Sequence, residues 1–217
     1  MIDFLQTLVE TFPIFAKAAL VTLELTLASL ALGTIIGLIF CLLKLSGNPV
    51  LRGITNLYIT VIRGTPLIVQ LFAIYYGLVS IVDFGQFWSA VIALAVHSGA
   101  YIAEIFRGGI QSIDKGQMEA ARSLGMSKGL AMRRIILPQA FQRIIPALGN
   151  QFIIGLKDSS LAAFITMEEL FMWAMRYAAT TLEEMKFYTI AGLYYLVLVM
   201  IFTFLVHRIE RRAKRYD

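Results

Sequence analysis

Five apolar segments, each about as long as a lipid bilayer is thick, dominate this sequence. A helix that crosses the hydrocarbon core needs about 20 consecutive apolar residues. We predict spans at residues 12–43, 54–82, 87–106, 138–156 and 187–206. Hydrophobic residues occupy 59% of the 217 positions and charged residues only 15%, which suits a surface that faces lipid. The chain is therefore predicted to be an all-α integral membrane protein, with a single transmembrane domain over residues 1–217.

The second apolar segment is interrupted by Arg63-Gly64-Thr65-Pro66. Glycine and proline both disfavour the interior of a helix. We interpret the interruption as a kink or discontinuity within one long tilted helix. Two separate spans would raise the total to six and would disrupt the charge pattern.

The charge pattern predicts the orientation of the chain. Fourteen of the 19 Lys and Arg residues lie in three alternate connections: residues 44–52, residues 107–143, and the C-terminal tail with Arg208, Arg211, Arg212, Lys214 and Arg215. Basic residues collect on the cytoplasmic side of membrane proteins. Five spans then place the N-terminus outside and the C-terminus inside.

Other features limit the possible functions. The net charge is +5, but the basic residues flank the spans, so we expect no nucleic-acid partner. The single cysteine, Cys41, lies within an apolar segment, which leaves neither a disulfide framework nor a cysteine-based metal site, and we predict no metal site. Asp3 and Glu10, without a basic cluster, precede the first span, so we expect no cleaved signal peptide.

The polar segment 107–138 is the most informative part of the chain. Asp114 and Gln117 form a capping-box pattern, and Gly125 is suited to ending a helix. The predicted helix has about ten residues, too few to be stable alone in water, so it must dock on another surface. Ala120 and Ala121 would give it a small, flat face for a partner.

The spacing in this segment is specific. Glu119-Ala120-Ala121 is followed after three residues by Gly125, and after nine more by Ile135, Leu137 and Pro138. The segment resembles the signature loop of the permease subunits of bacterial ABC importers. Three further stretches resemble the polar amino-acid branch of that family: 63–67 with Gln70-Leu71, 101–109, and 157–161.

The resemblance implies a location in the prokaryotic inner membrane and a set of partners. The loop would hold a coupling helix, with Glu119, Ala120, Ala121 and Gly125, that inserts into an ATPase subunit. Two permease subunits, identical or paralogous, would surround one path for an amino acid, and an extracellular solute-binding protein would deliver it. This chain lacks a phosphate-cradling Gly-x-x-x-x-Gly-Lys loop. ATP and Mg would therefore bind two partner ATPase subunits, and this chain would be neither an enzyme nor a cofactor-binding subunit.

Polar residues inside the spans are candidates for the substrate path, because charges at mid-bilayer cost ~2.5–3.5 kcal/mol on insertion scales. His97, Tyr101 and Glu104 share one face of the third span, with Ser98 beside it. This face either lines the path or packs on other helices. In the packing alternative Glu104 pairs with Arg107, and His97 is more readily explained as a hydrogen-bonded interior residue.

In the first span, small residues recur on one face that we expect to pack against another helix: Thr22, Thr26, Ser29, Gly33 and Gly37. Glu24 lies off this face and is the better candidate for substrate contact. In the second span, Arg63 could bind a substrate carboxylate, but we favour hydrogen bonds from it to the carbonyls of a neighbouring helix.

The fourth span and the residues directly after it contribute three more candidates. Asn150 and Gln151 are adjacent amides that must line a cavity or bond across an interface. Asp158 either lines the path or caps a helix that begins at Ser159. The predicted path residues are thus Glu24, Arg63, Ser98, Tyr101, Glu104, Asn150, Gln151 and Asp158.

Three other functions compete with an importer subunit. A proton-coupled secondary amino-acid transporter could use Glu24, His97 and Glu104 as a relay, although such proteins usually carry two repeats in one chain. An intramembrane enzyme lacks its nucleophile and metal motifs here. A channel would have no use for a coupling loop. The intramembrane acids favour a cationic substrate such as arginine, lysine or histidine, and glutamine or glutamate remain open.

Overall fold

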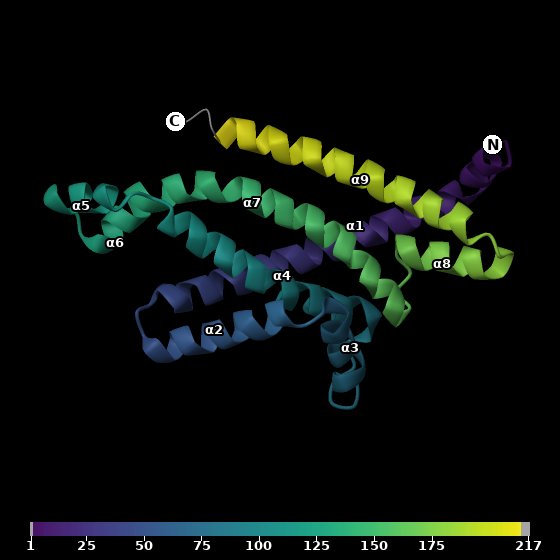
Figure 1. Ribbon diagram of the computed structural model, residues 1–217, viewed down its shortest axis with the longest axis horizontal. Helices are drawn as coiled ribbons and strands as arrows, with labels where there is room; N and C mark the ends of the chain where they lie inside the picture. The colour runs from purple at the N-terminus through teal and green to yellow at the C-terminus, as the bar shows by residue number, and fades with distance from the viewer. Residues whose placement is uncertain (1, 214–217) are drawn as a thin grey trace.

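The computed structural model describes residues 2–213, which form helices joined by short connections (Figure 1). Lys214 and Arg215 of the basic tail lie outside the described residues. The α-helices are α1 (Ile2–Leu45), α2 (Pro49–Gly64), α3 (Leu67–Leu78), α4 (Gly85–Gln111), α5 (Lys115–Ser123), α6 (Lys128–Ala131), α7 (Leu137–Asp158), α8 (Leu170–Thr181) and α9 (Glu184–Ala213). A π-helical segment, η1 (Met132–Ile136), joins α6 to α7, and a 3₁₀ segment, η2 (Ser159–Ile165), follows α7.

Within the described residues, three helices are long and apolar enough to cross a membrane: α1, α4 and α9. The bent pair of α2 and α3 makes a fourth crossing if it counts as one span. Helix α7 covers the predicted span 138–156, but Arg143, Asn150 and Gln151 are among the polar residues that lower its mean hydropathy.

The interruption after Arg63 is a sharp corner rather than a kink in one tilted helix. The axes of α2 and α3 differ in direction by 104°, so the expected discontinuity is present, but the two segments are not parts of one long tilted helix. Thr65 and Pro66 have extended backbone, with ψ values of 147° and 137°. A residue before proline avoids helical geometry, which ends α2 at this point and lets α3 set off in a new direction.

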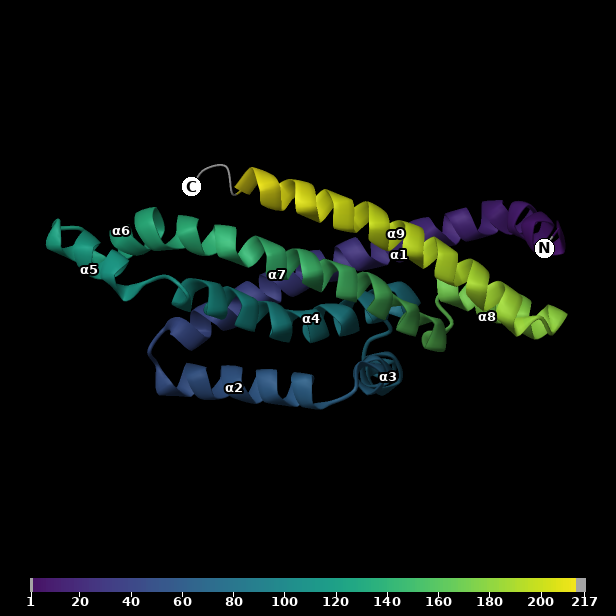
Figure 2. The same ribbon diagram turned by 45° about the horizontal axis from the view of Figure 1, so that its top comes forward.

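The centre of the fold is the contact between α1 and α4. Helix α1 runs most of the length of the molecule, and α4 lies along its second half (Figure 2). A Cβ atom on Gly33 would lie 2.3 Å from Ser98 Oγ, and one on Gly37 would lie 2.7 Å from Ile102 Cγ2. The predicted packing face of α1 is confirmed, because its other members are also buried: Thr22, Thr26 and Ser29.

Each end of the molecule has its own helices and its own buried apolar cluster. Helices α5 and α6 project at one end, and α8 lies at the opposite end near the N-terminus (Figure 1). At the α8 end, Phe15 of α1, Leu170 of α8 and Ile190 of α9 form one buried apolar cluster. At the α5 end, Ile113, Ile136 and Ile144 form another. Each end is thus built on its own small core.

Candidate functional site

Helix α5 is stabilised at both ends by its own sequence. Asp114 Oδ1 accepts a hydrogen bond from Gly116 N at 2.6 Å, so Asp114 caps the helix, although Gln117 does not complete the predicted capping box. At the other end Gly125 has φ +82°. Gly125 N donates to Arg122 O at 3.0 Å and Met126 N donates to Ala121 O at 3.1 Å. This is a Schellman motif, and it confirms the predicted role of Gly125 as a helix terminator.

The two alanines of α5 face different surroundings. Ala121 is only 4% exposed, because its side of α5 packs on the chain's own η1 segment. Glu119 and Ala120 are exposed. The prediction that Ala121 shares a free, flat surface with Ala120 is therefore wrong. Ala121 anchors the helix to the rest of the chain, and the surface open to a partner is carried by Glu119 and Ala120.

A polar cluster surrounds the corner between α2 and α3, and Gln70 is at its centre. Gln70 Nε2 donates to Ile62 O at 2.7 Å and to Thr65 O at 3.1 Å. These are backbone carbonyls at the end of α2, which have no partner within the helix. Gln70 Oε1 lies 3.0 Å from His97 Nδ1 on α4. His97 is therefore a hydrogen-bonded interior residue, as favoured above.

Arg63 and Tyr101 complete this group, which we call the corner cluster (Arg63, Gln70, His97 and Tyr101). The Arg63 guanidinium carbon lies 5.0 Å from the centre of the Tyr101 ring, within the range of a cation–π contact. The preferred hydrogen bonds from Arg63 to carbonyls of a neighbouring helix are not formed within the described residues, so that preference is wrong; the carbonyls at the end of α2 are bonded by Gln70 instead. The exposed guanidinium keeps a planar set of donors that suits a carboxylate.

The role of Gln70 was missed in the sequence, although one signal was present. A long amide side chain four residues after a proline break can return to the preceding carbonyls. Gln70 and His97 are 27 residues apart in the sequence, so no local pattern could indicate that they are in contact.

The other predicted path residues do not join the corner cluster. Ser98 is buried, and its Oγ donates to Ala95 O at 3.3 Å. Glu104 pairs with Lys44 Nζ of α1 at 2.8 Å and with Arg107 at 2.6 Å, as in the packing alternative. Glu24 and Asn150 are exposed, and Gln151 is buried.

Asp158 is half-buried at the end of α7. Its side chain does not cap the following 3₁₀ segment, so the capping alternative for this residue is wrong. The hydroxyl of Ser159 instead donates back to Leu156 O at 2.8 Å.

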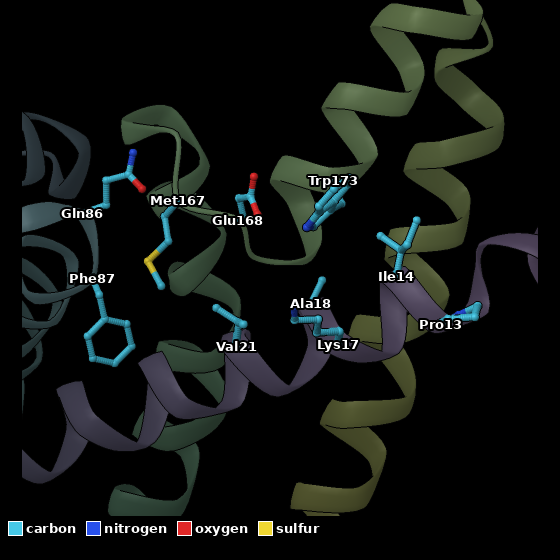
Figure 3. A pocket seen from close by; sticks show the side chains of 10 residues that line it. All are labelled: Pro13, Ile14, Lys17, Ala18, Val21, Gln86, Phe87, Met167, Glu168 and Trp173. Atoms are coloured by element: carbon cyan, nitrogen blue, oxygen red, sulfur yellow. The ribbon is translucent and has the colours of Figure 1, made fainter.

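A pocket of about 510 Å³ lies at the α8 end of the molecule (Figure 3). Lys17 of α1 and Gln86 of α4 line it, together with Glu168 and Trp173 near and on α8. Glu168 Oε1 accepts from Arg176 at 2.8 Å, and the Arg176 guanidinium carbon lies 4.6 Å from the centre of the Trp173 ring. The pocket therefore combines apolar walls with charges of both signs, and we call it the N-terminal pocket.

Glu169 is a fully buried acid that the sequence did not single out. Its Oε1 accepts from Met172 N at 2.7 Å and its Oε2 accepts from Tyr195 OH at 2.5 Å. Thr22 Oγ1 accepts from Leu170 N at 3.2 Å, so this network joins α1, α8 and α9. Burial raises the pKa of Glu169 to about 7. Glutamate is not among the residues that usually cap a helix N-terminus, so the sequence carried no clear signal of its role as the N-cap of α8.

Known proteins share both the sequence and the fold. The chain matches the family described as "Binding-protein-dependent transport system inner membrane component" over residues 29–215. The arginine transport system permease protein ArtQ of Bacillus subtilis (strain 168) is 39% identical, covering 100% of this chain and 99% of that protein. The glutamine transport system permease protein GlnP of Escherichia coli (strain K12) is 36% identical, covering 93% and 94%.

A solved structure described as an amino acid ABC transporter with histidines is similar along nearly the whole chain. It superposes with a TM-score of 0.91 at 42% identity, covering 98% of this chain and 99% of that chain. The exposed α5 helix and its sequence motif occupy the connection that the resemblance assigns to ATPase coupling. This chain belongs to the family of binding-protein-dependent transport system inner membrane components. It is the permease subunit of an ABC transporter, in which a separate subunit provides the ATPase activity.

Proposed function

We propose that this chain forms the membrane path of an ATP-driven importer for polar amino acids, with a preference for cationic ones. The observation that carries the proposal is the structure of α5: a helix of nine residues, capped at both ends, whose exposed side holds Glu119 and Ala120. A surface helix this short has little stability of its own. Its rigid attachment through Ala121 suits a part that transmits force from a partner.

The proposed topology has five crossings: α1, the bent pair of α2 and α3, α4, α7 and α9. The polar face of α7 is accommodated if it lines a water-filled path or a subunit interface. The basic connections then face the cytoplasm, with the N-terminus outside, and the chain forms one transmembrane domain.

The proposed assembly contains a second permease subunit, identical or paralogous, and two ATPase subunits that bind ATP and Mg. The ATPase subunits contact α5. A solute-binding protein docks at the opposite end, where the N-terminal pocket opens. ATP binding brings the two coupling helices together, and the path opens outward.

The corner cluster is the proposed contact for the substrate carboxylate, through the guanidinium of Arg63 with Tyr101 behind it. A broken helix is tolerated in a membrane where its backbone faces protein or water, which supports a wet environment at this corner. Glu24, Asn150, Gln151 and Asp158 remain proposed contacts for the rest of the substrate. The cationic preference is supported by the relative from an arginine transport system. Because another relative belongs to a glutamine transport system, uptake of both arginine and glutamine should be measured.

The test is a pair of matched substitutions, Ala120→Asp in α5 and Ala179→Asp in α8, both at exposed positions. An unpaired carboxylate in a protein groove is costly, so Ala120→Asp is expected to weaken ATPase binding by at least about tenfold and to abolish uptake at normal membrane levels. Ala179→Asp should retain ATPase binding. Normal ATP-dependent uptake by the Ala120→Asp complex would refute the coupling role of α5.

Family membership does not favour the alternative of a proton-coupled transporter, and proteoliposomes that hold the reconstituted complex distinguish it from the importer. Uptake that follows a proton gradient in the absence of ATP would favour the proton-coupled transporter. Uptake that requires ATP and the separate ATPase subunit supports the importer.

A further inference from the structure

A large apolar crevice lies at the α5 end of the molecule, away from the corner cluster. It has a volume of about 800 Å³, within the range of about 300–1,000 Å³ typical of small-molecule sites. Leu38 and Leu42 of α1, Phe106 of α4 and Phe141 of α7 are among its apolar lining residues, and Arg133 of η1 is a charged one.

The position of the crevice relates it to one surface of the membrane. Leu38 and Leu42 lie in the last turns of α1, which ends at Leu45, and Phe106 lies near the end of α4. The separation of seven residue steps between Leu38 and Leu45 corresponds to about 10 Å along the helix axis. The crevice therefore extends from the helix ends into the apolar part of the bundle, as an acyl chain does below its headgroup.

The crevice is open to the surroundings of the molecule. The side chains of Leu42 and Phe141 are 57% and 58% exposed. Large exposed apolar side chains around a hollow indicate an apolar occupant. The membrane supplies such an occupant wherever a helix bundle leaves space between its members.

The charges at the mouth of the crevice favour an anionic occupant. Arg133 is exposed, and no carboxylate within the described part of the chain forms a salt bridge with it. Nearby, Lys44 and Arg107 share the single carboxylate of Glu104, at 2.8 Å and 2.6 Å, which leaves one positive charge uncompensated. Basic pockets between helices on the cytoplasmic side attract anionic lipid headgroups.

We propose that this crevice binds an anionic phospholipid, with one acyl chain along Leu38, Leu42, Phe106 and Phe141 and the phosphate at Arg133. A second copy of the permease is the main alternative occupant. Apolar side chains from a second copy would place Arg133 in an interface without a counter-charge, which is costly. A phospholipid would place an acyl chain against the apolar walls and a negatively charged phosphate beside Arg133.

The first test measures lipid retention by the purified transporter complex, using native mass spectrometry with added phosphatidylglycerol or phosphatidylethanolamine. Wild type is expected to retain phosphatidylglycerol in preference. Arg133→Gln should reduce that retention about fivefold, the effect of one basic residue at an anionic membrane surface. Arg134→Gln removes the same charge at an exposed position outside the crevice and should leave retention unchanged. Equal retention in these two variants would overturn the phosphate assignment.

The second test fills the crevice. Leu42→Trp should displace retained lipid, whereas Leu27→Trp, at an exposed position of the same helix outside the crevice, should not. If Leu42→Trp instead releases a permease subunit and leaves lipid retention intact, the crevice is a subunit interface and the proposal is wrong. Neither readout depends on amino-acid uptake, so the outcome is separate from that of the proposed function.

Discussion

Gln70 illustrates what a single residue contributes at the corner between α2 and α3. One side chain donates to two carbonyls at the end of α2 and also contacts α4 through His97. A break in an apolar segment exposes backbone groups that need partners. The sequence identified the break from Gly64 and Pro66, and Gln70 lies close enough along the chain to reach the freed carbonyls. The contact of Gln70 with His97 joins residues 27 positions apart, which local patterns do not encode.

We predict that Gln70→Leu lowers the free energy of unfolding by ~0.5–1.5 kcal/mol, because it removes the part-buried hydrogen bond to Ile62 O and the exposed one to Thr65 O. The measurement is a denaturant titration of the purified chain in detergent micelles. Gln6→Leu is the control, since Gln6 is exposed and bonds only to exposed Glu10. Its effect should stay within about 0.5 kcal/mol. Equal effects of the two variants would show that Gln70 does not stabilise the corner.

Glu169 makes stability depend on pH. Its folded-state pKa of about 7 lies above the ordinary value of 4.5, so the folded state holds a proton that the unfolded chain has released. This stabilisation is complete below about pH 4.5 and is lost as the pH rises through about 7. Wild-type melting temperature should therefore fall between about pH 5 and about pH 8.

Glu169→Gln keeps an acceptor for Met172 N and cannot ionise, so its melting temperature should change less over that range. Glu168→Gln alters the neighbouring exposed carboxylate and should keep the wild-type pH dependence. A Glu169→Gln variant with the full wild-type dependence would exclude Glu169 as its source.

At the scale of elements, the positions of helices were predictable and several of their relations were not. Apolar runs and the terminator Gly125 indicated where helices lie. The 104° corner was not predictable, because glycine and proline end a helix without setting the direction of the next. The burial of Ala121 was missed for a similar reason: a short helix has two sides, and tertiary contacts decide which one is covered.

The contact between α1 and α4 should be intolerant of even one added methyl group. In Gly37→Ala the new Cβ would lie 2.7 Å from Ile102 Cγ2 and 3.0 Å from Ala103 N, so we expect a loss of ~1–3 kcal/mol in unfolding free energy. Gly192→Ala on α9 meets nothing within 4 Å and should be neutral or stabilising. The measurement is the unfolding of both variants in increasing concentrations of a denaturing detergent. An unchanged unfolding free energy for Gly37→Ala would show that α1 and α4 can move apart without cost.

At the scale of the whole molecule, alternate basic connections are the basis for the proposed topology. The structure places α5 and α8 at opposite ends (Figure 1), which that topology requires. The substrate path was less accessible to sequence reasoning. Glu104 meets Lys44 across 60 residues of chain, and such pairings determine which polar residues are free to face a substrate.

Two matched cysteine substitutions test the topology. Leu124 and Leu182 are 84% and 81% exposed, whereas the native Cys41 is 1% exposed and should react little. In intact cells, a membrane-impermeant maleimide should label Leu182→Cys and should reach Leu124→Cys only after permeabilisation. The reverse pattern would invert the orientation, and labelling of both from outside would rule out the proposed topology.

The π-helical segment η1 also bears on how the gene can change. It lies within an unbroken helical stretch from Lys128 to Asp158, and a π-helical turn holds one residue more than an α-helical turn. An in-frame deletion of one codon in η1 would therefore convert this turn to α-helix and keep α6 in phase with α7. An in-frame deletion of one codon in the middle of α7 would instead rotate all the preceding part of the helix by about 100°, so we expect it to be tolerated far less well than the deletion in η1.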